Sequence, residues 1–131
     1  MEKVLEIAQR VWNNMEQYRK DNGYYNMAGL CGLSSLVLEK SLKAHGIRSQ
    51  AKFGTYKGDN HAWVEWNYHI LDVTVSQFGV QKDILLTPIG SFASKHYEEE
   101  YAVKWNDGTF CDWPRPEKPS PAKINKLAAL P

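Results

Sequence analysis

The chain has 131 residues, of which 43% are hydrophobic and 24% are charged, a composition typical of one globular domain with a single core. Its apolar runs are much shorter than a membrane span, and its formal net charge of +1 creates no field that would attract a polyanion. We therefore expect neither a membrane nor a nucleic-acid partner. The N-terminus interleaves charged and apolar residues, unlike a secretory signal, which favours a cytoplasmic location.

The first part of the sequence predicts two helices. Apolar residues recur with a 3.6-residue period over residues 2–20, and Gly23 supplies a C-terminal stop. A loop over residues 24–30 leads into a second apolar cluster over residues 31–45, which Gly46 ends. The first turn of this second helix therefore begins with a cysteine.

Alternating side chains after the second helix predict a meander of antiparallel strands. The expected strands cover residues 47–56, 61–66, 69–75, 84–89 and 101–105. From residue 114 the chain is rich in proline, and Ser120 followed by Pro121 predicts the start of a short helix over residues 123–130. We expect one domain over residues 1–113 and a proline-rich tail over residues 114–131.

Cys31 is the first candidate for a nucleophile. A helix N-terminus supplies partial positive charge and free amide hydrogens, which lower the pKa of a thiol and can stabilise an oxyanion. The alternative is a small hydrophobic residue inside a helix. The second cysteine, Cys111, is expected to be a packed or partly exposed thiol, and a disulfide is disfavoured because the expected compartment is reducing.

The expected hairpin places a histidine beside an aspartate. If Asn67–Tyr68 is a two-residue turn, His61 and Asp72 lie on one sheet face as diagonal neighbours, whereas a three-residue turn would separate them. An aspartate there can bind one imidazole nitrogen while the other nitrogen faces a thiol. We therefore expect Cys31, His61 and Asp72 to form a catalytic triad.

Four short strings lie in the same part of the chain. They are Cys31-Gly32-Leu33-Ser34-Ser35-Leu36, Gly46-Ile47, His61-Ala62-Trp63-Val64-Glu65 and Ile70-Leu71-Asp72-Val73-Thr74. Together they resemble the transglutaminase-like cysteine enzymes, a branch of the papain-like fold, over roughly residues 28–80. In length and in the His-Ala-Trp-Val-Glu string the chain is similar to the small bacterial leader peptidases of lasso peptide biosynthesis. Some bacterial and phage proteins also share a strand like residues 72–78.

The resemblance implies an α+β fold with a papain-like or transglutaminase-like core, in which the nucleophile helix packs on the antiparallel β-sheet meander. It also implies that Cys31 attacks an acyl carbon, that His61 moves the proton and that Asp72 holds His61, without a cofactor. Papain-like enzymes use a side-chain amide before the cysteine as an oxyanion donor, and Asn26 is the nearest candidate.

Two further residues complete the expected site. Gln77 is the alternative oxyanion donor, and Trp63, on the same strand face as His61, is expected either to form a wall of the site or to pack under the helix. The other histidines, His45, His69 and His96, are expected to be structural or surface residues.

The expected function is a cysteine peptidase or amidase that acts on a peptide or protein substrate. A transglutaminase or deamidase acting on glutamine side chains would use the same chemistry. A non-catalytic binding or inhibitor module on the same fold is the alternative from another class. Zinc accepts all three ligand types of the triad, but paired ligand motifs are lacking in the sequence, so a metal site is disfavoured.

Overall fold

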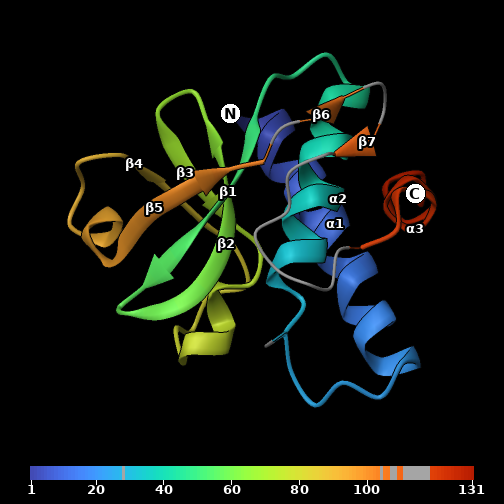
Figure 1. The fold of residues 1–131 in the computed structure, drawn as a ribbon, viewed down its shortest axis with the longest axis horizontal. Coiled ribbons are helices and arrows are strands. Elements are labelled where there is room, and N and C mark those ends of the chain that lie inside the picture. Colours follow the sequence, from blue (N-terminus) through green and yellow to red (C-terminus); the bar gives the residue numbers. More distant parts are fainter. Residues whose placement is uncertain (28, 104, 107–108, 111–118) are drawn as a thin grey trace.

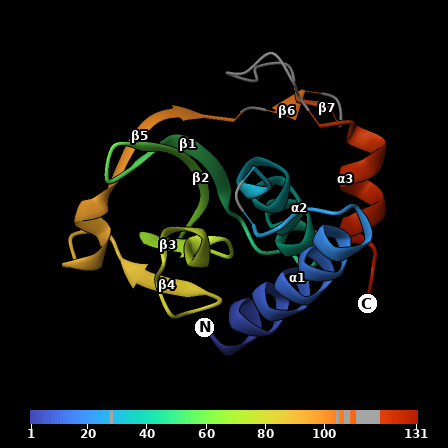
Figure 2. The ribbon, with the colours of Figure 1, turned by 90° about the horizontal axis from the view of Figure 1, so that it is seen from below.

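The computed structural model describes residues 1–27, 29–103, 105–106, 109–110 and 119–131. Within these residues the chain forms three α-helices, a five-stranded antiparallel sheet and a two-stranded ribbon. The expected α+β class is therefore confirmed. Figure 1 shows the five-stranded sheet on one side of the molecule and the helices on the other, and the perpendicular view in Figure 2 shows the same two layers.

The three helices end close to the residues that the sequence predicts. They are α1 (Glu2–Asp21), α2 (Cys31–Ala44) and α3 (Pro121–Ala128). Gly23 and Gly46 follow the first two with φ angles of 76° and 73°, the left-handed conformation that glycine adopts without strain. The Ser120 side chain caps α3 by accepting a hydrogen bond from the Lys123 backbone N–H at 3.3 Å.

Helix α2 lies at the centre of the molecule. Helices α1 and α3 and strands β1 (Gln50–Tyr56) and β2 (Asp59–Trp66) all contact it, and for this reason it is buried on nearly every side. Its one buried carboxylate, Glu39, accepts a hydrogen bond from the Ala51 backbone N–H of β1. This hydrogen bond joins the second half of α2 to the sheet.

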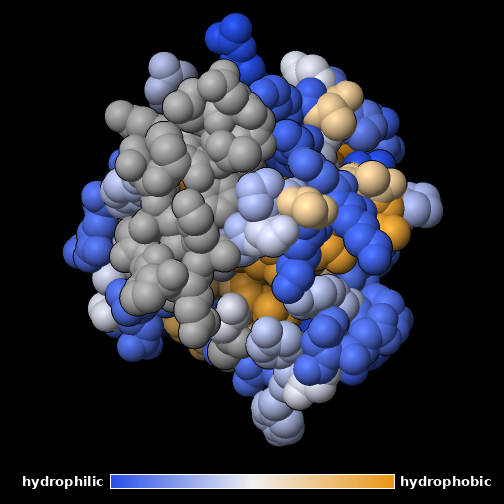
Figure 3. All heavy atoms as spheres, turned by 45° about the vertical axis from the view of Figure 1, so that its right-hand side comes forward, coloured by the Kyte–Doolittle hydropathy of each residue, from blue (hydrophilic) through white to orange (hydrophobic). Residues whose placement is uncertain are grey.

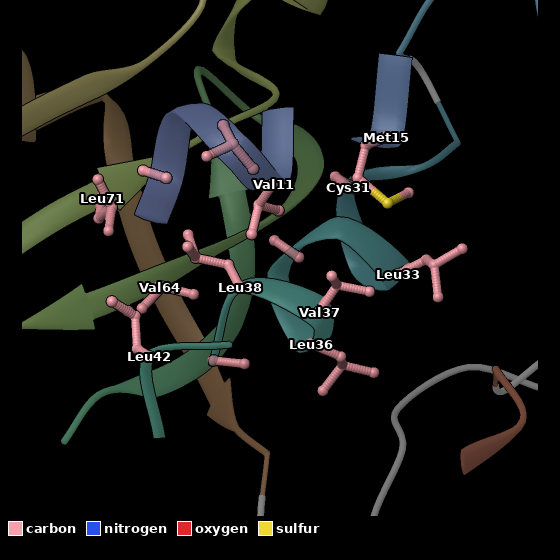
Figure 4. Packing of buried hydrophobic residues seen from close by; sticks show 14 of the residues in the cluster. Val11, Met15, Cys31, Leu33, Leu36, Val37, Leu38, Leu42, Val64 and Leu71 are labelled. Atoms are coloured by element: carbon pink, nitrogen blue, oxygen red, sulfur yellow. The ribbon is translucent and has the colours of Figure 1, made fainter. Parts of the chain in front are cut away.

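The core joins the helices to one face of the sheet. Figure 4 shows part of this cluster, in which α1 contributes Val11 and Met15, α2 contributes Leu38, and the sheet contributes Val64 and Leu71. Cys31 belongs to the same cluster, at the first turn of α2. Ile124 and Leu127 of α3 are buried in it as well, so the C-terminal helix shares the core of the rest of the described chain. The expected boundary between residues 113 and 114 lies outside the described residues.

The sheet has the order β4-β3-β2-β1-β5. The remaining strands are β3 (His69–Asp72), β4 (Leu85–Pro88), β5 (Tyr97–Ala102) and, in the separate ribbon, β6 (Trp105–Asn106) and β7 (Thr109–Phe110). The turn Asn67–Tyr68 has two residues, both with positive φ, and Trp66 pairs with His69 across it. The expected turn length is therefore confirmed.

All five strands differ in extent from the prediction: β2 begins at Asp59 instead of His61 and β4 is one residue shorter at each end, while β1, β3 and β5 differ more. β1 begins at Gln50 instead of Ile47. β3 ends at Asp72 and a 3-10 helix over Val75–Phe78 follows, because the Asp72 carboxylate accepts the Thr74 backbone N–H and turns the chain. The last strand of the sheet covers Tyr97–Ala102 instead of residues 101–105, because an exposed edge strand tolerates the glutamates that disfavour a strand elsewhere.

A close approach of two backbones shapes the β1–β5 pair. The register shifts between Phe53 and Gly54, and a Cβ atom at Gly54 would lie 1.8 Å from the Glu98 carbonyl oxygen and 2.9 Å from Trp63. Only glycine fits this position without a shift of the backbone.

Among the residues that Figure 3 colours by hydropathy, most of those turned forward are hydrophilic, and apolar side chains show between them at a lower level. Within the described residues, none of the helices combines the length and apolarity needed to cross a bilayer.

Candidate active site

The structure brings His61 and Asp72 into direct contact. His61 lies on β2 and Asp72 is the last residue of β3, and the imidazole Nε2 is 2.6 Å from the carboxylate Oδ2. The two side chains are 0% and 1% exposed to solvent. A contact this short between buried polar groups is a strong, directional hydrogen bond.

Cys31 is the third member of this group. The residue is 5% exposed and begins α2, and its thiol hydrogen-bonds to the His61 side chain. Because Asp72 occupies Nε2, the ring edge that carries Nδ1 is the one that faces the thiol. The imidazole therefore connects the carboxylate on one edge with the sulfur on the other.

The N-terminus of α2 adds an electrostatic contribution at Cys31. The first helical hydrogen bond runs from the Ser34 N–H to the Leu30 carbonyl at 2.8 Å, so the amides before Ser34 lie at the open, positive end of the helix. The first turn of α2 carries no acidic side chain. A negative charge on the Cys31 sulfur, or on an oxygen next to it, would be stabilised there.

The Asp72 carboxylate is held by four hydrogen bonds. Oδ2 accepts from His61 Nε2 and from the Tyr97 hydroxyl, each at 2.6 Å. Oδ1 accepts from the Thr74 backbone N–H at 2.9 Å and from the Thr74 hydroxyl at 3.3 Å. Both oxygens are thus fixed in orientation, as a group that orients a catalytic histidine requires.

The surroundings of His61 favour its protonated form. Burial by itself lowers the pKa of the imidazole, but the hydrogen bonds and charges of Asp72 and Cys31 outweigh burial and raise this pKa from 6.5 to about 9. The ring therefore carries a positive charge at neutral pH. An imidazolium beside a thiol is the arrangement that converts the thiol into a thiolate.

The expected accessory residues lie at different distances from this centre. Gln77 is brought to it, with Nε2 3.1 Å from His61 Nδ1 and 3.3 Å from the Thr74 hydroxyl. Trp63 stacks on His61, with ring centroids 6.0 Å apart and an interplanar angle of 30°. Asn26 is exposed in the loop before α2, and its role as an oxyanion donor stays a prediction.

Aromatic rings surround the imidazole on several sides. Phe78 meets it edge-on with centroids 4.7 Å apart, and Tyr56 and Tyr97 lie 6.1 Å and 6.0 Å away. These rings exclude water from the His61–Asp72 contact, which strengthens its electrostatic component.

Sequence reasoning missed Tyr97 and Thr74. The spacing Asp72-Val73-Thr74 is typical of an Asx turn, so Thr74 was within reach of a local prediction. Tyr97 had no such signal, because it enters the site only when β5 pairs with β1 at the far edge of the sheet. Non-local pairing of this kind leaves no local pattern in the sequence.

The remaining histidines make local contacts. His45 Nδ1 lies 3.0 Å from the Ser41 carbonyl, His69 Nδ1 lies 2.8 Å from the Asn67 carbonyl, and His96 packs edge-on against another ring. Among the described residues, no group of three or more His, Cys, Asp or Glu side chains is arranged to hold a metal ion. Cys111 and its expected environment lie outside the described residues.

Comparisons with known proteins do not assign the chain to a family. No protein-family model, no curated protein and no solved structure matches it. What the protein does must therefore be inferred from the side chains of the site: a buried carboxylate, an imidazole and a thiol at a helix N-terminus, in contact in that order.

Proposed function

We propose that the protein is a thiol-dependent acyl-transfer enzyme with a papain-like, transglutaminase-like core, acting as a cysteine peptidase or amidase on a peptide or protein substrate. One observation carries the proposal: the His61 ring is hydrogen-bonded to Asp72 at 2.6 Å and also to the thiol of Cys31, the first residue of α2. A buried ionisable pair is costly to form, so its presence beside a thiol needs a reason.

The chemistry follows from the positions of these groups. The Cys31 thiolate attacks the carbonyl carbon of an amide and forms a carbon–sulfur bond. His61 gives its proton to the leaving nitrogen as the carbon–nitrogen bond breaks. Water then attacks the thioester, His61 takes a proton from that water, and the acid leaves as the Cys31 sulfur is released.

The oxyanion of the first step has two sources of hydrogen-bond donors. The backbone amides of the first turn of α2, which Cys31 begins, are one source. The Gln77 amide lies at His61 Nδ1, and in the charged ring this nitrogen carries a proton and does not accept a hydrogen bond from Gln77. The amide is then available to the oxyanion, so Gln77 is the better placed of the two expected side-chain donors.

Two other functions use the same side chains. A transglutaminase would form the same thioester from a glutamine side chain and transfer the acyl group to an amine, and a deamidase would transfer it to water. A binding module would keep the fold without the reaction. The four hydrogen bonds on Asp72 favour catalysis, because binding alone does not require an oriented histidine.

Alkylation by iodoacetamide separates enzyme from binding module. We expect Cys31 to be alkylated rapidly and at a nearly constant rate from about pH 6 to pH 8, because the thiolate is already formed. A Cys111→Ser variant leaves Cys31 as the reporting thiol, and Cys31→Ala gives the background. Slow alkylation that rises toward about pH 8.5, the ordinary thiol value, would favour the binding module.

A labelled peptide library identifies the reaction. Mass spectrometry distinguishes cleavage, deamidation of glutamine and crosslinking to an amine, and the Cys31→Ala variant should lose at least roughly a thousandfold of whichever activity appears. Unchanged turnover by Cys31→Ala in a folded protein would exclude the proposed role of the thiol.

A further inference from the structure

We propose that Tyr97 is a positioning residue that fixes the Asp72 carboxylate and weakens its hold on the protonated His61. The inference rests on the proposed function of Cys31, His61 and Asp72 as a catalytic site. It comes from one shared atom: Oδ2 of Asp72 accepts both His61 Nε2 and the Tyr97 hydroxyl, each at 2.6 Å.

Two donors on one oxygen compete for the same negative charge. Each hydrogen bond to a carboxylate disperses part of its charge, so the phenol reduces what remains for the imidazolium. The carboxylate cannot turn to offer its other oxygen, because Thr74 occupies Oδ1 with its N–H and its hydroxyl. The phenol therefore limits how strongly Asp72 retains the proton on His61.

Tyr97 is held firmly enough to act in this way. It pairs with Tyr56 across the β1–β5 ladder, and its ring packs edge-on against Tyr56 at 5.0 Å and Trp63 at 5.1 Å. Burial, followed by the charge of Asp72, raises the pKa of the Tyr97 phenol, so it keeps its proton and donates throughout the neutral range.

The titratable groups that face the imidazole come from four elements. They are Asp72 of β3, Cys31 of α2, Tyr56 of β1 and Tyr97 of β5. A histidine held too tightly in its charged form is a poor acid toward the leaving amine and a poor base toward water. Moderation by a neutral donor brings His61 nearer to the working pH.

Tyr97→Phe removes the hydroxyl and keeps the ring contacts. We expect the pKa of His61, followed by NMR of the labelled imidazole, to rise by about half a unit to one unit, a three- to tenfold change in the dissociation constant. The rate of Cys31 alkylation by iodoacetamide should also change at the pH where the imidazolium loses its proton. In Tyr97→Phe the pH of this change should be higher by the same amount. Tyr68→Phe is the control, because Tyr68 is 81% exposed in the β2–β3 turn.

A second substitution, expected to shift the pKa of His61 in the opposite direction, distinguishes this effect from a general loss of structure. Replacement of Tyr97 by 3-fluorotyrosine makes the phenol more acidic and a stronger donor at nearly constant shape, and it should lower the pKa of His61. If the role of Tyr97 is purely structural, the two substitutions should change the stability of the protein but neither the pKa of His61 nor the pH profile of Cys31 alkylation.

The outcomes distinguish this inference from the proposed function. If wild-type Cys31 behaves as an activated thiolate but neither Tyr97 variant moves the pKa of His61 in its expected direction, the role of Tyr97 is wrong and the proposed function stands. If wild-type Cys31 is alkylated as an ordinary thiol, the proposed function fails. The NMR titration of His61 still decides the Tyr97 coupling in that case.

Discussion

The protonation of His61 couples the stability of the protein to pH. The pKa of this imidazole is raised in the folded protein from 6.5 to about 9 by Asp72 and Cys31, against the opposing effect of burial. The folded state thus holds the proton more tightly than the unfolded chain. The resulting stabilisation is complete below pH 6.5 and is lost as the pH rises through about 9.

The size of the effect follows from the same shift. A rise from 6.5 to about 9 corresponds to about 3 kcal/mol of unfolding free energy, at 1.36 kcal/mol for each unit. The cleanest measurement uses Cys31→Ala, in which the thiol does not titrate. In this variant about 3 kcal/mol is an upper limit, because Cys31 supplies part of the pKa shift in the wild-type protein. We expect the unfolding free energy of Cys31→Ala to fall by roughly 1–2 kcal/mol between pH 6 and pH 9.

Urea unfolding at several pH values measures this loss. The double variant Cys31→Ala/Asp72→Asn is the matched control, because it keeps the shape of the contact but removes its charge, and its stability should vary much less over the same range. An unfolding free energy in Cys31→Ala that stays level, or rises, from pH 6 to pH 9 would refute the reasoning about the His61–Asp72 pair.

Three further substitutions test other parts of the structure. Gly54→Ala should lower the free energy of unfolding by roughly 2–4 kcal/mol, because its Cβ would lie 1.8 Å from the Glu98 carbonyl oxygen. Gly58→Asn, in an open turn, should lower it by under about 1 kcal/mol. Similar urea midpoints for the two variants would contradict the close approach. Asp72→Asn should slow Cys31 alkylation at pH 6 about tenfold, with the folded fraction checked by circular dichroism, and an unchanged rate would exclude an orienting role. Ser120→Ala should lower stability by about 1 kcal/mol through loss of the α3 cap, without changing the alkylation rate of Cys31; a changed rate would mean that α3 also shapes the site.

Local patterns in the sequence were enough to predict the helices and the central hairpin. Periodicity and glycine stops located α1 and α2, and the two-residue turn at Asn67–Tyr68 fixed the parity that places His61 and Asp72 on one face. These features depend on neighbours in the chain, so they are visible without a structure.

Features that depend on tertiary contacts were not predictable in this way. β3 was expected to run to Val75, but the side chain of Asp72 ends it by binding Thr74. β5 begins earlier in the chain than predicted, because its glutamates are exposed on an edge strand and its position is set by pairing with β1. The Tyr97–Asp72 hydrogen bond is a consequence of that pairing, and it could not be anticipated without it.

The candidate site is divided among α2, the β2–β3 hairpin and β5, three parts of the chain that are well separated along the polypeptide. A nascent chain that has left the ribosome only as far as the second helix carries a cysteine of ordinary reactivity, because the imidazole and carboxylate that would activate it have not yet been synthesised. An activated thiol, if the proposed function holds, would arise late, with completion of the sheet. Pulse alkylation during translation would therefore report when the native topology forms.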